Sequence, residues 1–163
     1  MALAANIGSN FAAKFGQIQA YPVALGVTIY RGATVVIHGA GDSEGYAGPA
    51  TDDTADTLKQ IVVGIAEEKK DNSASAVNGQ DSDGKTITVR VRQDGKVKRK
   101  FPSNLPACVG KLACVKDDET VQLYVDGTEC NTVVGRITEQ SGSQNVFVNF
   151  DDRPMRLATG LND

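Results

Sequence analysis

The chain has 163 residues, of which 40% are hydrophobic and 23% charged, a composition typical of a globular domain rather than a disordered chain. This length is ordinary for one domain and long enough for a hydrophobic core. The net charge is −3, and no run of about 20 mostly apolar residues is present, so we expect no membrane span.

The N-terminal 30 residues contain one charged side chain, Lys14. A solvated tail normally carries more charge, so we expect residues 1–20 to form an extended arm against the parent domain, a neighbouring subunit or a larger surface. Phe11, Lys14 and Phe15 are the candidate contact residues of this arm. The alternative is an end of low complexity without fixed structure.

From residue 25 onward, short β-branched runs separated by glycine predict β-strands. The expected strands lie at residues 27–29, 34–37, 61–66, 85–92, 96–101, 108–109 with 112–115, 120–125, 132–137 and 145–150. Gly64 falls in the middle of one run and indicates a bulge. Because no helix of about 10 residues is apparent and no repeat of fixed period is visible, the chain predicts an all-β fold. We expect a single-domain β-sandwich or barrel of short antiparallel strands over residues 21–150, followed by a C-terminal tail at 151–163.

The clearest local pattern is a hairpin at residues 85–101. Ile87, Val89 and Val91 alternate with polar residues, and Asp94-Gly95 is a typical tight-turn pair. In the returning run, Arg99 interrupts the apolar face. A charge at that position is typical of an edge strand.

This hairpin is also basic, with seven basic residues and one acidic residue between positions 85 and 100. The candidate contact residues are Arg90, Arg92, Lys96, Lys98 and Lys100. They predict either an anionic partner, such as a phosphate backbone or an acidic protein surface including a second copy, or a merely solvated face. Nucleic acid is the less favoured partner, because the segment offers only Phe101 for stacking and the whole chain is acidic.

We expect no catalytic residues, no cofactor and no metal, and therefore no enzyme. His38 is the one histidine and has no evident nucleophile, and carboxylate pairs such as Asp52-Asp53 point to opposite faces of a strand. Cys108, Cys114 and Cys130 are odd in number and lack Cys-x-x-Cys spacing. They predict three small buried hydrophobes in a protein made in a reducing cytoplasm.

Several stretches resemble one known family. They are Gly32-Ala33-Thr34-Val35-Val36 leading to Gly45-Tyr46-Ala47, then Ala55-Asp56-Thr57, Val63-Gly64-Ile65-Ala66-Glu67, Val109-Gly110-Lys111, Thr120-Val121, Val134-Gly135-Arg136-Ile137 and Val146-Phe147-Val148. Together, over residues 31–150, this pattern is similar to the capsid cement, or head decoration, proteins of tailed bacteriophages.

The resemblance implies a structural virion protein, made in the host cytoplasm, that binds the exterior of an assembled capsid. It implies that the protein bridges major capsid protein subunits, and that it forms a homotrimer. Two alternatives stay open. One is a nucleic-acid-binding module that uses the basic hairpin, and the other is a different virion component, such as a tail or neck subunit or a receptor-binding domain.

Overall fold

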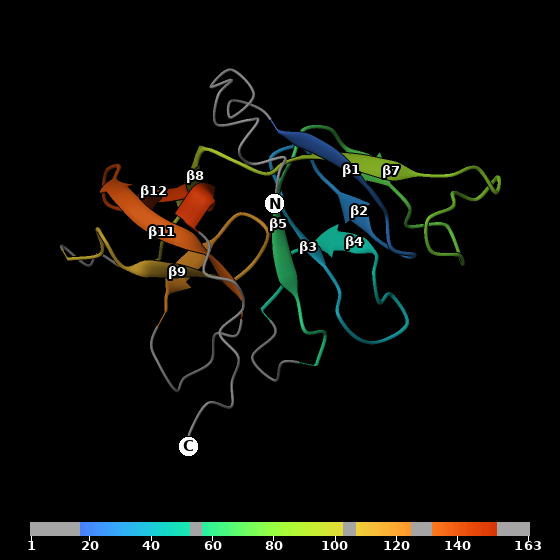
Figure 1. Cartoon of the computed structure of the whole chain (residues 1–163), viewed down its shortest axis with the longest axis horizontal. Coiled ribbons are helices and arrows are strands. Elements are labelled where there is room, and N and C mark those ends of the chain that lie inside the picture. Colours follow the sequence, from blue (N-terminus) through green and yellow to red (C-terminus); the bar gives the residue numbers. More distant parts are fainter. Residues whose placement is uncertain (1–16, 53–56, 103–106, 125–131, 153–163) are drawn as a thin grey trace, which may run out of the picture.

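The computed structural model describes residues 17–52, 57–102, 107–124 and 132–152 (Figure 1). The strands are β1 (Ile18–Pro22), β2 (Thr28–Ile29), β3 (Thr34–Ile37), β4 (Ala47–Pro49), β5 (Ile61–Ala66), β6 (Lys70–Asp71), β7 (Thr88–Arg92), β8 (Lys96–Lys100), β9 (Leu112–Val115), β10 (Val121–Leu123), β11 (Val133–Gln140) and β12 (Asn145–Asn149), followed by the 3-10 helix η1 (Phe150–Asp152). The all-β, largely antiparallel fold expected from the sequence is confirmed. Within the described ranges, no helix is long and apolar enough to span a bilayer.

The chain contains the same five-stranded arrangement twice. In the first unit the strands lie in the order β1-β7-β5-β3-β4, and in the second unit in the order β8-β12-β11-β9-β10. Taken along the chain, both units therefore place their first strand beside the fifth, the fifth beside the fourth, the fourth beside the second and the second beside the third. The two units form the right and left lobes of Figure 1. A two-stranded ribbon of β2 and β6 is added to the first unit.

The equivalence extends to individual residue pairs. Val35 pairs with Gly64 on β5, and Ala113 pairs with Gly135 on β11, and the pairing register shifts beside each glycine. At both glycines an added Cβ would overlap a carbonyl oxygen of the adjacent strand. The bulge expected at Gly64 is thus confirmed, and Gly135 repeats it in the second unit.

Each unit curls until its outermost strands approach each other. In the first unit, Val23 directly after β1 forms a parallel bridge with Ala47 of β4. In the second unit, Lys100 at the end of β8 forms a parallel bridge with Thr120, directly before β10. Both sheets are therefore small, nearly closed barrels, and among the described residues the first strand of each is unpaired on its outer edge except near these bridges.

The structural duplication has no fixed period in the sequence, in agreement with the absence of a visible periodic repeat. Gly32 corresponds to Gly110, Gly64 to Gly135, and Arg92 to Asn149, and the separations within these three pairs all differ because the connecting loops differ in length. The two units share the short sequence Val-Val-Gly, at residues 62–64 in β5 and 133–135 in β11. A search for a fixed period cannot detect a duplication of this kind.

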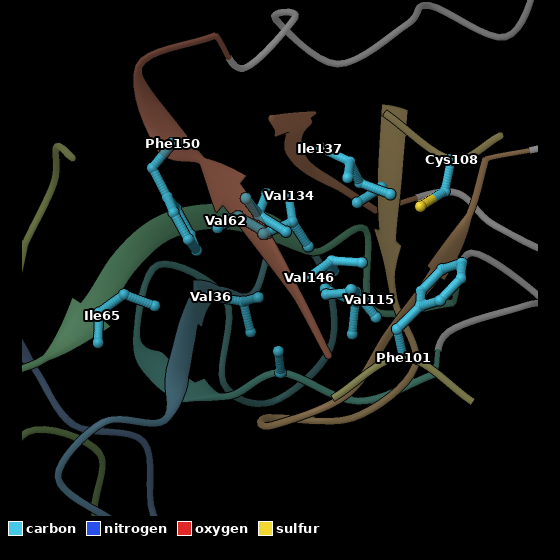
Figure 2. Packing of buried hydrophobic residues seen from close by; sticks show 14 residues of the cluster. Val36, Val62, Ile65, Phe101, Cys108, Val115, Val134, Ile137, Val146 and Phe150 are labelled. Carbon is cyan, nitrogen blue, oxygen red and sulfur yellow. The ribbon is translucent and has the colours of Figure 1, made fainter. Parts of the chain in front are cut away.

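Two hydrophobic clusters support the two units. One lies inside the first unit and is formed by Val23, Ile29, Ala33, Val35, Ala47, Ala66, Val89 and Val91. The other fills the second unit and continues onto the outer face of the first, where Val36, Val62 and Ile65 meet Phe150 (Figure 2). The alternating side chains of β3 and β5 therefore serve both clusters, and this shared layer joins the two lobes.

The predicted hairpin does not form. β7 lies between β1 and β5 in the first unit, whereas β8 pairs with β12 at the edge of the second. The Asp94-Gly95 turn, with Gly95 at φ +93°, therefore carries the chain from one unit to the other. Both edges of β7 are already occupied, so β8 has to find its partner elsewhere. The prediction that β8 is an edge strand is confirmed.

The structure agrees only in part with the expectations for the N-terminal arm, the C-terminal tail and the cysteines. The arm was expected to end at residue 20, but β1 begins at Ile18, so its last residues belong to the first unit. The expected tail begins within η1, and residues 153–163 lie outside the described residues. Cys108 is a buried free thiol as expected. Cys114 is disulfide-bonded, so the expectation of three unpaired cysteines is wrong at this residue. An odd number of cysteines leaves one of them unpaired but does not exclude a disulfide between two others. Cys130 lies outside the described residues.

Candidate interaction surfaces

The basic residues predicted to form one ladder lie on two separate units. Arg90 and Arg92 project from β7 in the first unit, while Lys96, Lys98 and Lys100 project from β8 in the second. Successive side chains of a strand alternate between its faces, so each set lines the outer face of its own sheet. The continuous basic hairpin that motivated the nucleic-acid alternative is therefore absent.

The two arginines of β7 are engaged by acidic neighbours. The Nε atom of Arg92 lies 2.7 Å from Glu67 Oε1, and that of Arg90 lies 3.4 Å from Glu68 Oε1. Burial by itself would raise the pKa of Glu68, but a backbone hydrogen bond from Arg90 and the charges of Lys70 and Arg90 outweigh it and lower the pKa. The outer face of β7 is thus close to neutral and offers little attraction to an anion.

Lys100 is also paired. Its Nζ lies 2.6 Å from Glu119 Oε2, and this hydrogen bond with the carboxylate raises the pKa of Lys100. Its backbone N–H donates to the carbonyl oxygen of Glu119 at 3.1 Å, which closes that end of the β8 edge.

Lys96 and Lys98 form the remaining basic strip. Both side chains are exposed on β8, and no ion pair joins either one to a carboxylate among the described residues. Phe101 N–H donates to the carbonyl oxygen of Gln144, directly before β12. Every second residue of β8 counted back from Phe101, namely Arg99 and Val97, therefore also turns its backbone groups toward β12. The backbone groups of Lys96 and Lys98 consequently face the open edge, where the two ammonium groups flank any approaching chain.

Arg99, between these lysines, points the opposite way and is buried. Its Nη2 donates to the carbonyl oxygen of Gly32 in the first unit at 2.9 Å, and Thr34 N–H donates to the carbonyl oxygen of Asp118 at 2.7 Å. These bonds cross the junction between the two units. Arg99 Nε and Thr34 Oγ1 are buried there without a hydrogen-bond partner within the part of the chain that the structure describes.

Burial dominates the electrostatics of this junction. It lowers the pKa of Arg99 to about 10, against the opposing attraction of Asp118, Glu119 and Asp117. Burial likewise raises the pKa of Asp118, and repulsion from Asp117 and Glu119 adds to the effect. The junction is therefore a polar contact that fixes how the two units sit together. The sequence indicated Arg99 as an edge residue but not as a link between units.

The edge of β1 that faces away from β7, unpaired from Ile18 to Ala20 among the described residues, is a second candidate surface that the sequence did not indicate. β1 occupies in the first unit the place that β8 occupies in the second. Ile18 is 46% exposed, Ala20 is exposed as well, and neither residue carries charge. The only sequence signal was the scarcity of charge in the first 30 residues.

The remaining predicted contact residues, Phe11, Lys14 and Phe15, lie outside the described residues. Across the described ranges, no group of three or more His, Cys, Asp or Glu side chains is placed to hold a metal ion.

Comparison with known proteins gives little further information. No family model matches the chain, and no curated protein matches it. One solved structure that it resembles is the N base of the head fiber protein gp8.5 of bacteriophage phi29, with a TM-score of 0.46 and 16% sequence identity over 82% of this chain and 93% of that one. At this level of similarity the match carries no argument about function.

Proposed function

We propose that the protein is a structural component of a phage virion that binds the exterior of an assembled capsid and stabilises it by bridging major capsid protein subunits. In this proposal it is made in the host cytoplasm and has no catalytic role. The proposal rests on the resemblance to capsid cement proteins. Two of the stretches that carry it include strand residues at equivalent places in the two units, Val63–Ala66 in β5 and Val134–Ile137 in β11.

The observation that carries the capsid contact is the strip formed by Lys96 and Lys98. Two exposed ammonium groups without a described carboxylate partner lie on an edge strand, and the backbone of that strand also faces outward. An acidic segment of a shell subunit can satisfy both the charges and the backbone groups at once. A ligand that binds only the assembled shell stabilises it by mass action, and many modest contacts add together on a repeating surface.

Co-sedimentation tests this proposal. Empty expanded capsids that lack the protein, purified from a phage that encodes this chain, are mixed with the purified protein and pelleted. We expect the wild-type chain to pellet with the capsids and a Lys96→Glu/Lys98→Glu variant to remain in the supernatant. The matched control is Lys85→Glu/Lys111→Glu, which makes the same change in net charge at two other exposed lysines.

Three outcomes would contradict the proposal. The wild-type chain could fail to pellet with capsids, the Lys96→Glu/Lys98→Glu variant could pellet as well as wild type, or both double variants could lose binding equally. The last result would point to nonspecific attraction by net charge. Salt-sensitive binding to nucleic acid in place of capsids would favour the alternative module instead.

A further inference from the structure

Asn78 and Gly79 form the one Asn-Gly pair in the sequence. In an unfolded chain such a pair is prone to deamidation, because glycine has no side chain to hinder its own backbone nitrogen. That nitrogen loses its proton and attacks Cγ of the asparagine. A bond from the nitrogen to Cγ forms, the bond from Cγ to Nδ2 breaks, and ammonia leaves. Water then opens the resulting succinimide ring to aspartate or isoaspartate.

The side-chain amide of Asn78 is held by three hydrogen bonds in the folded chain. Its Oδ1 accepts from Leu25 N–H at 2.8 Å and from the Ser43 hydroxyl at 3.3 Å. Its Nδ2 donates to the carbonyl oxygen of Asp42 at 2.6 Å. The oxygen thus faces two donors and the nitrogen faces an acceptor, so the orientation of the amide is fixed. The amide ties the loop at residues 38–46, between β3 and β4, to the residues that follow β1.

The attacking nitrogen, that of Gly79, is held as well. Its N–H donates to the carbonyl oxygen of Val23 at 2.8 Å, and the Gly79 carbonyl oxygen accepts from Ile87 N–H at 3.0 Å. Gly79 has φ +72°, and a Cβ added to it would lie 3.1 Å from the ring of Tyr46. Deamidation in the folded chain therefore requires the amide of Asn78 to leave its three partners and the N–H of Gly79 to leave Val23.

From these contacts we infer that Asn78 is a deamidation site whose reactivity is controlled by the loop at residues 38–46. The reaction is suppressed while the loop is docked on Asn78 and proceeds when the loop opens. The product does not restore the original contact, because a carboxylate at position 78 has no hydrogen to donate to the carbonyl oxygen of Asp42 and repels it. Deamidation therefore makes a transient opening of the loop permanent.

The first test uses the wild-type chain. The full-length protein is incubated at mildly alkaline pH, with and without enough guanidinium chloride to unfold it, and deamidation of the peptide that contains Asn78 is followed by mass spectrometry. We expect the rate in the folded protein to be lower by at least about tenfold, since several hydrogen bonds must break before the reaction. Equal rates in the folded and unfolded protein would overturn the inference.

A second test separates the effect of the loop from that of folding in general. Ser43→Ala removes one of the three hydrogen bonds on Asn78 and should raise the rate in the folded protein by about 2–10-fold. Ser141→Ala, in the turn between β11 and β12 of the second unit, is the matched control and should leave the rate unchanged. Circular dichroism establishes that both variants are folded. A rate for Ser43→Ala equal to that of wild type would show that the loop does not control the reaction.

Asn78→Asp reproduces one product of the reaction and tests its effect on the loop. Within the loop, Glu44 N–H donates to Gly41 and Gly45 N–H donates to His38. We expect these two amides to exchange with deuterium about tenfold faster in Asn78→Asp than in wild type, with the amides of β7 unchanged.

Gln80→Glu adds the same charge two residues away, at an exposed side chain, and is the matched control for Asn78→Asp. Asn78→Ala, which removes the same donor without adding charge, takes the place of Asn78→Asp should that variant fail to fold. Loop amides that exchange as in wild type, or equally fast in Gln80→Glu, would contradict the permanent opening. Because no capsid is present, these results are independent of the capsid-binding experiment.

Discussion

The guanidinium of Arg99 reaches from the second unit to the first, where its Nη2 donates a 2.9 Å hydrogen bond to the carbonyl oxygen of Gly32. The equivalent carbonyl in the second unit, that of Gly110, also accepts a hydrogen bond from an arginine, but this arginine is Arg136 of the same unit. One structural position is thus capped within its own unit in one case and across the junction in the other.

Arg99→Ala is expected to lower the free energy of unfolding by about 2–3 kcal/mol, because it removes a charged hydrogen bond and the packing of a buried side chain. Chemical denaturation followed by circular dichroism measures this loss. Arg136→Ala is the matched control and, at an exposed arginine, should cost less than about 1 kcal/mol. Equal losses for the two variants would show that Arg99 has no special role at the junction.

Gly64→Ala and Gly135→Ala should each destabilise the protein by at least about 2 kcal/mol, because the new methyl group would overlap a backbone carbonyl that can move only with its strand. Thermal unfolding measures both variants. Gly142→Asn is the control, since Gly142 has φ +71° and open space around it, and asparagine tolerates that backbone region. A melting temperature close to wild type for either alanine variant would contradict the proposed equivalence of the two bulges.

The pKa of Asp71 is lowered to about 2, first by the side-chain and backbone hydrogen bonds from Ser73 and then by that from Thr28. A lowered carboxyl pKa stabilises the fold above the unfolded value of 3.8, and this contribution is lost as the pH falls toward 2. Titration of the Asp71 carboxyl carbon by NMR should show its midpoint near 2. Asp71→Asn should lower stability at neutral pH, with the difference from wild type shrinking at acid pH. A midpoint near 3.8 would refute both expectations.

Phe150 lies in the shared layer between the units and is 1% exposed. Phe150→Ala should cost about 3–5 kcal/mol through lost burial and a residual cavity. Because this layer belongs to both units, we expect one cooperative unfolding transition with a lower midpoint in denaturant. Tyr30→Ala, at a side chain that is 57% exposed, should change little. Separate transitions for the wild-type units would argue against a jointly stabilised core.

The sequence by itself determined where most strands lie and what class of fold they build. Alternating apolar residues and short runs bounded by glycine predicted the strands around Val35, Val89, Val134 and Val146. The strand that carries Arg99 is an edge strand as predicted, although Arg99 itself is buried at the junction and does not protect that edge. These features are local, because side-chain alternation and turn chemistry act over a few residues.

Only the tertiary structure decided which strands pair. The Asp94-Gly95 turn looked like the tip of a hairpin, but β7 completes its hydrogen bonds with β1 and β5, so the turn joins two units instead. The exposed face of β1, the link from Arg99 to Gly32 and the duplication itself follow from that choice. Strand pairing depends on residues far apart in the sequence, because the backbone hydrogen bonds and the packing of both faces of each strand must be satisfied together. A local sequence pattern determines which side chains share a face of a strand, but it does not determine which strand pairs with it.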